Sequence, residues 1–90
     1  MAKLYKTNGE VVEIEPKNGK KFTLEEVQSY VEGYVERVEL KHNEVLLCNE
    51  EAILYCLPYN KHASDALAET YGPNSQALFG NIIHCLRKQF

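Results

Sequence analysis

Turn and break signals divide the chain into short segments along its whole length. Asn8-Gly9 is typical of a two-residue β-hairpin turn, Pro16 cannot donate a hydrogen bond to a β-ladder, and Gly72-Pro73 interrupts a helix. No segment between such signals approaches the about 20 apolar residues of a membrane-spanning helix. With 90 residues, the chain therefore predicts a single small domain, residues 1–90, built from short elements and tight turns.

The N-terminal part carries the pattern of a β-hairpin. Residues 3–6 and 10–15 flank the Asn8-Gly9 turn, and the second of these segments places Val12 and Ile14 on one face. Because a strand shows its side chains alternately on two faces, this spacing predicts a strand with one buried face.

Capping residues predict the first helix. Thr23 is a good N-cap, and Glu26, three residues later, completes a capping box with it. Apolar residues then recur at helical spacing, so we expect a helix over residues 24–32. Gly33 is expected to end this helix in the left-handed conformation.

The remaining apolar runs predict further strands and a second helix. Glu36 shares the face of Val38 within its segment, which indicates either a bulge or an inward-facing carboxylate. Asn60 is a good N-cap for a helix that ends before Gly72. The further strands are expected over residues 34–41, 44–49, 53–57 and 78–86. This order of elements predicts an α+β domain with a mostly antiparallel or mixed sheet of about six strands and two helices packed on one face.

Charge and cysteine content exclude some classes of protein. Thirteen acidic residues against ten basic ones give a net charge of -3, which disfavours a binder of duplex nucleic acid. The N-terminus has no apolar signal core, and the number of cysteines is odd, with Cys48, Cys56 and Cys85. We therefore expect buried free thiols in a reducing cytoplasm, that of a bacterium or of an infected host cell, and no contact with a membrane.

The spacing of the cysteine and histidine residues gives little support for a metal site or for a catalytic cysteine nucleophile. Neither a Cys-x-x-Cys nor a His-x-x-x-His pattern is present, so we expect no metal and no cofactor. A cysteine nucleophile would need a neighbouring base. The possible pairs combine His62 or His84 with Cys48, Cys56 or Cys85, and nothing in the sequence brings any of them together.

Polar residues next to apolar strands are the strongest candidates for a site. Asn49 closes a strand, Asn60 begins a helix, and Gly80-Asn81 interrupts the last apolar run. Each also has a structural explanation, as a turn former, a cap or a packing accommodation. If they converge, the helix N-terminus could hold an anion, and Tyr34, Tyr55 or Tyr59 could stack on a base. The candidate ligand-binding residues are Asn49, Tyr59, Asn60, Lys61, His62 and Asn81.

Four short motifs connect the chain with a known family. They lie at residues 30–36, 47–51, 57–64 and 78–83 and read YVEGYVE, LCNEE, LPYNKHAS and LFGNII. In this order they resemble the phage- and plasmid-borne domain of unknown function 3846, over residues 24–85. The chain departs from the family pattern at Glu32 and Ala52, where the pattern has glycine. The resemblance implies a shared fold and a phage or mobile-element context, and it brings no catalytic assignment.

Three functions remain in competition. The leading hypothesis is a non-enzymatic accessory protein that binds a small anionic, nucleotide-like ligand or a host protein. The first alternative is a small hydrolase that uses a cysteine and a histidine. The second is a purely structural protein that forms a homodimer or higher oligomer through a sheet edge or a tyrosine-rich face.

Overall fold

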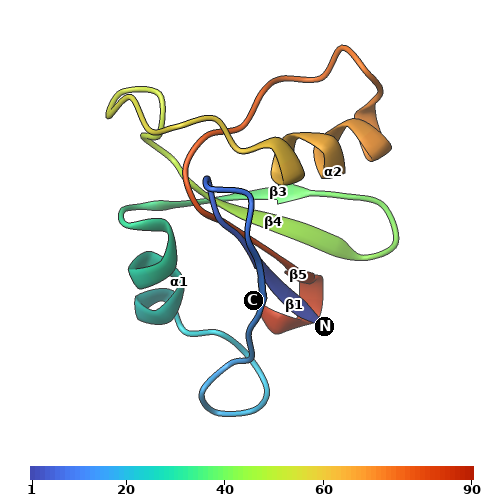
Figure 1. Ribbon diagram of the computed structural model, residues 1–90. Coiled ribbons are helices and arrows are strands. Elements are labelled where there is room, and N and C mark those ends of the chain that lie inside the picture. Colours follow the sequence, from blue (N-terminus) through green and yellow to red (C-terminus); the bar gives the residue numbers. More distant parts are fainter.

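A five-stranded antiparallel sheet forms the centre of the molecule, with one helix on each of its faces (Figure 1). The computed structural model describes residues 1–90. The strands follow the order β2-β1-β5-β4-β3, so the last strand of the chain lies in the middle of the sheet. The elements are β1 (Ala2–Tyr5), β2 (Val11–Glu13), α1 (Leu24–Val31), β3 (Val35–Glu39), β4 (Glu44–Asn49), α2 (Lys61–Tyr71), β5 (Ile82–Leu86) and a short 3-10 helix, η1 (Arg87–Gln89).

Strand β4 carries apolar side chains on both faces of the sheet, so both faces must be buried by other elements. Val45 and Leu47 belong to the core under α1, whereas Leu46 and Cys48 belong to the core under α2. All four side chains are buried. Because burying one such aliphatic side chain stabilises a fold by about 1.5–3 kcal/mol, neither face can be left to solvent. The prediction of an α+β domain is confirmed, and the placement of both helices on one face is wrong for this reason.

The predicted capping box of α1 is confirmed. The Thr23 hydroxyl accepts a hydrogen bond from the Glu26 amide at 3.1 Å, and the Glu26 carboxylate accepts one from the Thr23 amide at 3.1 Å. The same carboxylate also accepts the Lys17 amide at 2.9 Å, so it ties the preceding loop to the helix. These backbone donors, with Lys17 first, lower the pKa of Glu26.

The left-handed residue after α1 is Glu32 and not Gly33. Glu32 has a φ of 65°, whereas the φ of Gly33 is not positive. Gly33 serves a different purpose, because an added Cβ there would lie 2.6 Å from the side-chain nitrogen of Asn49. The helix end therefore needs a small residue at position 33 for close packing and tolerates a strained residue at position 32.

Replacing Glu32 with glycine is expected to stabilise the domain by about 1 kcal/mol. Glycine adopts the left-handed conformation without the steric cost that a Cβ brings. Urea unfolding followed by circular dichroism measures the change. Glu25→Gly is the matched control, because Glu25 lies inside α1 and glycine there costs helix propensity.

Two of the predicted strands differ from the structure: one is absent and the other is shorter. Residues 53–57 form no strand, because the chain turns repeatedly between residues 50 and 56. The last strand begins at Ile82 and not at residue 78, since Gly80 has φ of 83° and its amide donates to the Pro58 carbonyl. An isolated antiparallel bridge joins Tyr59 to Phe79. The sheet consequently has five strands where about six were predicted.

Glu36 lies on the sheet face that α2 covers, without a bulge, but its side chain is exposed. The register of β3 against β4 runs without interruption from Val35 opposite Asn49 to Glu39 opposite Val45, so there is no bulge. Glu36 therefore stays on the same face as Val38, the face that α2 covers. Neither α1 nor α2 combines the length and apolar character that crossing a membrane requires.

Candidate functional site

One end of the sheet gathers the segments that carry the candidate residues. Tyr5, at the end of β1, lies opposite Ile82, at the start of β5. Asn49, at the end of β4, lies opposite Val35, at the start of β3. The antiparallel pairing of β4 with β5 places these four positions at the same end of the sheet. The loops that follow or precede them form the surface described below.

Asn60 is completely buried and joins three parts of the chain. Its side-chain oxygen accepts the Ala63 amide at 3.0 Å, which caps α2. Its side-chain nitrogen donates to the Tyr5 carbonyl and to the Gly80 carbonyl, each at 2.8 Å. Residues 60 and 80, whose convergence the sequence leaves open, are joined by this direct hydrogen bond. The side-chain amide of Asn60 is fully engaged by backbone groups of the protein itself.

Asn49 and Asn81 also hold backbone in place, at separate points. The buried Asn49 donates to the Val31 carbonyl at 3.1 Å and accepts the Glu51 amide at 2.8 Å, so it links the end of α1 to the loop after β4. Asn81 accepts the Thr7 amide at 3.0 Å and so fixes the hairpin turn. No hydrogen bond joins Asn49 to Asn60 or Gly80. The binding role predicted for these asparagines stays a prediction.

The remaining candidate residues are exposed at the start of α2 and just before it. Lys61 pairs with Asp65 at 2.8 Å, and this hydrogen bond raises the pKa of Lys61. His62 donates from Nε2 to the Gly9 carbonyl at 3.2 Å. Tyr59 packs edge-on against Phe79, with ring centroids 6.1 Å apart, and is half exposed.

The most unusual surface lies in the loop after β4, at residues 50–57, of which residues 53–57 were predicted to form a strand. Ile53 and Leu54 are each 70% exposed, and Tyr55 is 60% exposed. The loop follows directly on β4 and stands away from the sheet in Figure 1. We call residues 50–57 the apolar loop. Its one sequence signal is an apolar run directly after two glutamates, a pattern that a buried strand shares.

The apolar loop has a defined conformation. Ala52 is buried, and its carbonyl accepts the Leu57 amide at 3.0 Å. The Tyr55 amide donates to the Glu51 carbonyl at 3.0 Å, and the Cys56 amide to the Ile53 carbonyl at 3.1 Å. Because these backbone hydrogen bonds fix the path of the loop, the three apolar side chains are held in solvent by the fold itself.

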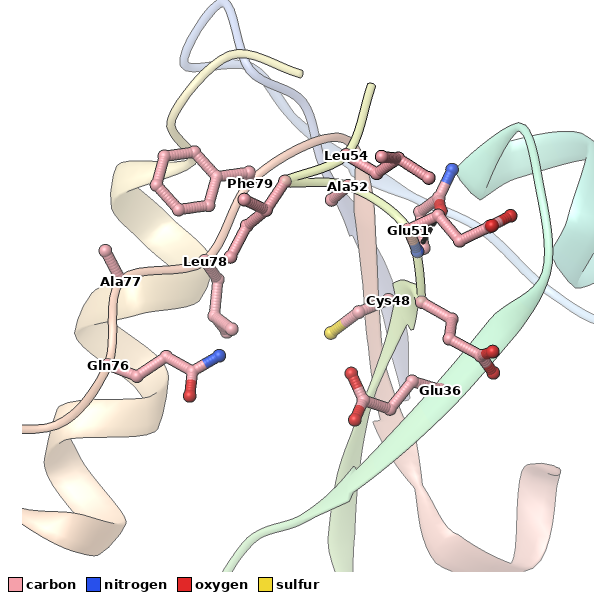
Figure 2. Close-up of a pocket in the computed structure, with 12 residues that line it drawn as sticks. Glu36, Cys48, Glu51, Ala52, Leu54, Gln76, Ala77, Leu78 and Phe79 are labelled. Atoms are coloured by element: carbon pink, nitrogen blue, oxygen red, sulfur yellow. Dashed lines mark hydrogen bonds between the residues drawn. The ribbon is translucent and has the colours of Figure 1, made fainter. Parts of the chain in front are cut away.

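A cavity lies on each side of the apolar loop. The first cavity, of about 210 Å³, opens between the loop, strands β3 and β4, and residues 76–79 (Figure 2). The second cavity, of about 450 Å³, opens between the loop and the end of α1. The first is lined by Glu36, Cys48, Asn49, Glu50, Glu51, Ala52, Ile53, Leu54, Gln76, Ala77, Leu78 and Phe79, and the second by Gln28, Glu32, Gly33, Tyr34, Asn49, Glu51, Tyr55 and Leu57.

Charge around the apolar loop has one sign. Carboxylates line both cavities, and no lysine, arginine or histidine lines either of them. The acidic side chains are Glu36 and Glu50 in the first cavity, Glu32 in the second, and Glu51 in both. This surface therefore favours cations and disfavours anions.

A comparison with protein families assigns the chain. The family model for a domain of unknown function, DUF3846, matches residues 3–89. The chain belongs to this family. The match extends beyond residues 24–85, where the four motifs lie, to almost the whole chain. No curated protein and no solved structure matches it.

The cysteines of this DUF3846 domain have no histidine partner. His84 hydrogen-bonds to Tyr5 at 2.8 Å and to Glu44 at 2.7 Å, on the face opposite its neighbour Cys85. Burial raises the pKa of Cys85 to about 11, and burial together with the Glu36 charge raises the pKa of Cys48 to about 12. A thiol held protonated in this way is a weak nucleophile.

We expect only one thiol of the folded DUF3846 domain to react at pH 8. Cys56 is exposed, whereas Cys48 and Cys85 are buried and protonated. Titration with Ellman's reagent should release one equivalent rapidly, and the other two only after denaturant is added. Rapid release from Cys56→Ser protein would contradict this account, because that variant retains only the buried thiols.

The same pKa values predict a loss of stability in alkali. An unfolded cysteine ionises near pH 8.5, but the folded state keeps Cys48 and Cys85 protonated up to about 12 and about 11. Above about pH 9 the folded state therefore binds more protons, and the free energy of unfolding falls as the pH rises. Urea unfolding at pH 7 to 10 measures this slope. A Cys48→Ala variant should show a shallower slope than the wild type.

Proposed function

We propose that this DUF3846 domain is a protein-binding module whose contact surface is the apolar loop together with its two flanking cavities. The observation that carries the proposal is the exposure of Ile53, Leu54 and Tyr55 by a loop whose backbone is internally hydrogen-bonded. Contiguous apolar side chains of this kind are uncommon on a monomer's surface and mark sites of interaction. A preorganised aromatic and two aliphatic anchors lose little conformational entropy on binding.

Charge favours a basic partner over a second copy of the chain. In a symmetric dimer built on this loop, the carboxylates of Glu32, Glu36 and Glu50 would be brought into the same interface as those of the second copy, and like charges at an interface are costly. A partner with apolar side chains flanked by lysine or arginine meets no such penalty. The same carboxylates disfavour a nucleotide-like anion at this surface.

The other readings carry less support. An anion site at the start of α2 remains a prediction, and a thermal shift assay against nucleotides would test it. No pair of cysteine and histidine side chains supports a hydrolase. A role as an accessory protein of a phage or plasmid is implied by the resemblance alone, and the neighbouring genes would test it.

Selection of peptides from a random display library tests the proposal. The immobilised chain is the target, and the variant Ile53→Ser/Leu54→Ser/Tyr55→Ser is used for counter-selection. We expect enriched peptides that combine aromatic or aliphatic residues with lysine or arginine. Their affinity for the variant should be at least about tenfold weaker, since each lost apolar anchor is worth on the order of 1–2 kcal/mol.

Two results would contradict the proposal. One is the absence of any peptide that prefers the wild type over the loop variant. The other is a concentration-dependent dimer in sedimentation that the three serine substitutions abolish, since the loop would then join two copies of the chain. A matched control, Met1→Ser/Val11→Ser, removes exposed apolar side chains elsewhere and should leave peptide binding unchanged.

A further inference from the structure

We propose that the first cavity is a subsite for a single lysine or arginine side chain of the partner. This inference rests on the proposed protein-binding function and adds the chemistry of one recognition pocket to it. Three observations support it: an unpaired carboxylate, an apolar floor, and a volume suited to one side chain.

Glu36 is an exposed carboxylate of this cavity that lacks an internal partner. Two other acidic side chains of the sheet are paired: Glu39 binds Arg37 at 2.8 Å and Arg87 at 2.9 Å, and Glu44 binds His84 at 2.7 Å. Glu36 takes part in no ion pair and no hydrogen bond, although Arg37 is its neighbour in sequence. Adjacent residues of a strand point to opposite faces, so Arg37 and Glu36 cannot meet.

The floor of the first cavity is apolar and neutral. Cys48, Ala52 and Leu78 are buried beneath it, and Figure 2 shows Glu36, the Cys48 sulfur and Leu78 directed toward the same space. Because the pKa of Cys48 is about 12, the sulfur stays protonated at neutral pH and carries no charge. The cavity therefore owes its charge to carboxylates at its wall and rim and offers apolar contact below them.

Lysine and arginine side chains match both the apolar floor and the carboxylates of this cavity. Their methylene stems pack on apolar surface while the charged head stays near polar groups. The head would meet the Glu36 carboxylate, and the Gln76 side-chain carbonyl offers a second acceptor. A neutral side chain would instead leave Glu36 desolvated and unpaired, which is costly.

Size and ligand count exclude two other occupants. A helix with its side chains is about 10 Å across and does not enter a cavity of about 210 Å³, whereas one extended side chain does. The structure contains no group of three or more histidine, cysteine, aspartate or glutamate side chains that could hold a metal ion. One long cationic side chain is thus the occupant that the cavity fits.

Amino acid amides test the subsite without any partner. The probes are N-acetyl-arginine amide and N-acetyl-lysine amide, and the neutral controls are the citrulline and norleucine equivalents. Heteronuclear NMR of the full chain should show millimolar binding of the cationic probes, with shifts centred on Glu36, Cys48 and Gln76. Glu36→Gln should weaken this binding at least tenfold. Glu39→Gln, on the same strand but the opposite face, should leave it unchanged.

The outcomes separate this inference from the proposed function. Equal shifts with citrulline amide, or binding that survives Glu36→Gln, would overturn the subsite. A selected peptide that needs the apolar loop but binds Glu36→Gln with wild-type affinity would also overturn the subsite, while the protein-binding function would stand. Glu36-dependent binding of arginine amide without any loop-dependent peptide would support the cation site and remove the proposed function of the loop.

Discussion

The Asn60→Ala variant is expected to lose about 3–5 kcal/mol of stability, because one fully buried side chain supplies three hydrogen bonds. The substitution removes the N-cap of α2, worth about 1 kcal/mol. It also leaves the Tyr5 and Gly80 carbonyls without their donor, at about 1–3 kcal/mol for each group that stays unsatisfied. A domain of this size has only about 5–15 kcal/mol in total, so the variant should lose a large fraction of its stability.

Urea unfolding followed by circular dichroism measures this loss, and two variants isolate its origin. Asn60→Ser keeps a cap acceptor for α2 but removes the donor to Tyr5 and Gly80, so it should recover only about 1 kcal/mol. Asn18→Ala is the matched control, because the exposed Asn18 accepts only the nearby Lys20 and Lys21 amides. A loss below about 0.5 kcal/mol in Asn60→Ala would show that the side chain is not the structural link described here.

The Gly33→Ala variant is expected to lose about 2–3 kcal/mol, although it adds one methyl group. The new Cβ would lie 2.6 Å from the Asn49 side-chain nitrogen, closer than real contacts allow. Asn49 is buried, and it cannot withdraw without giving up its bonds to Val31 and Glu51. The cost therefore combines overpacking with lost hydrogen bonds.

A double-mutant cycle tests whether the two residues are coupled in this way. Asn49→Ala alone should also be destabilising, because it leaves the Val31 carbonyl and the Glu51 amide without partners. In the Asn49→Ala background, however, Gly33→Ala meets no side-chain amide and should cost at least 1 kcal/mol less than in the wild type. Strict additivity of the two substitutions would contradict the contact.

Local signals in the sequence predicted local structure well. The Thr23–Glu26 capping box and the Asn60 cap each depend on residues within a few positions of one another, and both are present. The turn at Asn8-Gly9 is also present, but Tyr5 lies opposite Val11 and the Lys6 amide donates to the Glu10 carbonyl, so the turn takes up residues 7–9 and not two residues. The position of Glu36 on the face of Val38 also follows from alternation along a single strand. Such features need no knowledge of the rest of the fold.

Features that depend on the whole fold were not accessible in the same way. An apolar run of strand length at residues 53–57 has the composition of a core strand, and a binding surface has that composition too. In this run only Ala52 is buried, whereas Ile53 and Leu54 are exposed. The runs in β4 and β5 that are apolar on both faces did contain the signal for one helix on each face.

The candidate site in the structure also differs from the predicted one, because it depends on contacts between distant parts of the chain. Asparagine residues next to strands suggest ligand contacts, but the partners of Asn49 and Asn60 are distant backbone groups, up to 55 positions away in the case of Tyr5. The spacing of residues along the sequence does not predict such partners. The cavities beside the apolar loop likewise arise only when β3, the loop and residues 76–79 come together.

The most direct test of the central claim is the affinity of one selected basic peptide for the wild type and for Leu54→Ser, measured by isothermal titration calorimetry. Leu54 is 70% exposed, so its substitution should leave the midpoint of thermal unfolding unchanged. We predict that the peptide binds Leu54→Ser at least about tenfold more weakly than the wild type, which corresponds to about 1.4 kcal/mol. Equal affinity for the two proteins, with equal thermal stability, would contradict the assignment of the apolar loop as the binding surface.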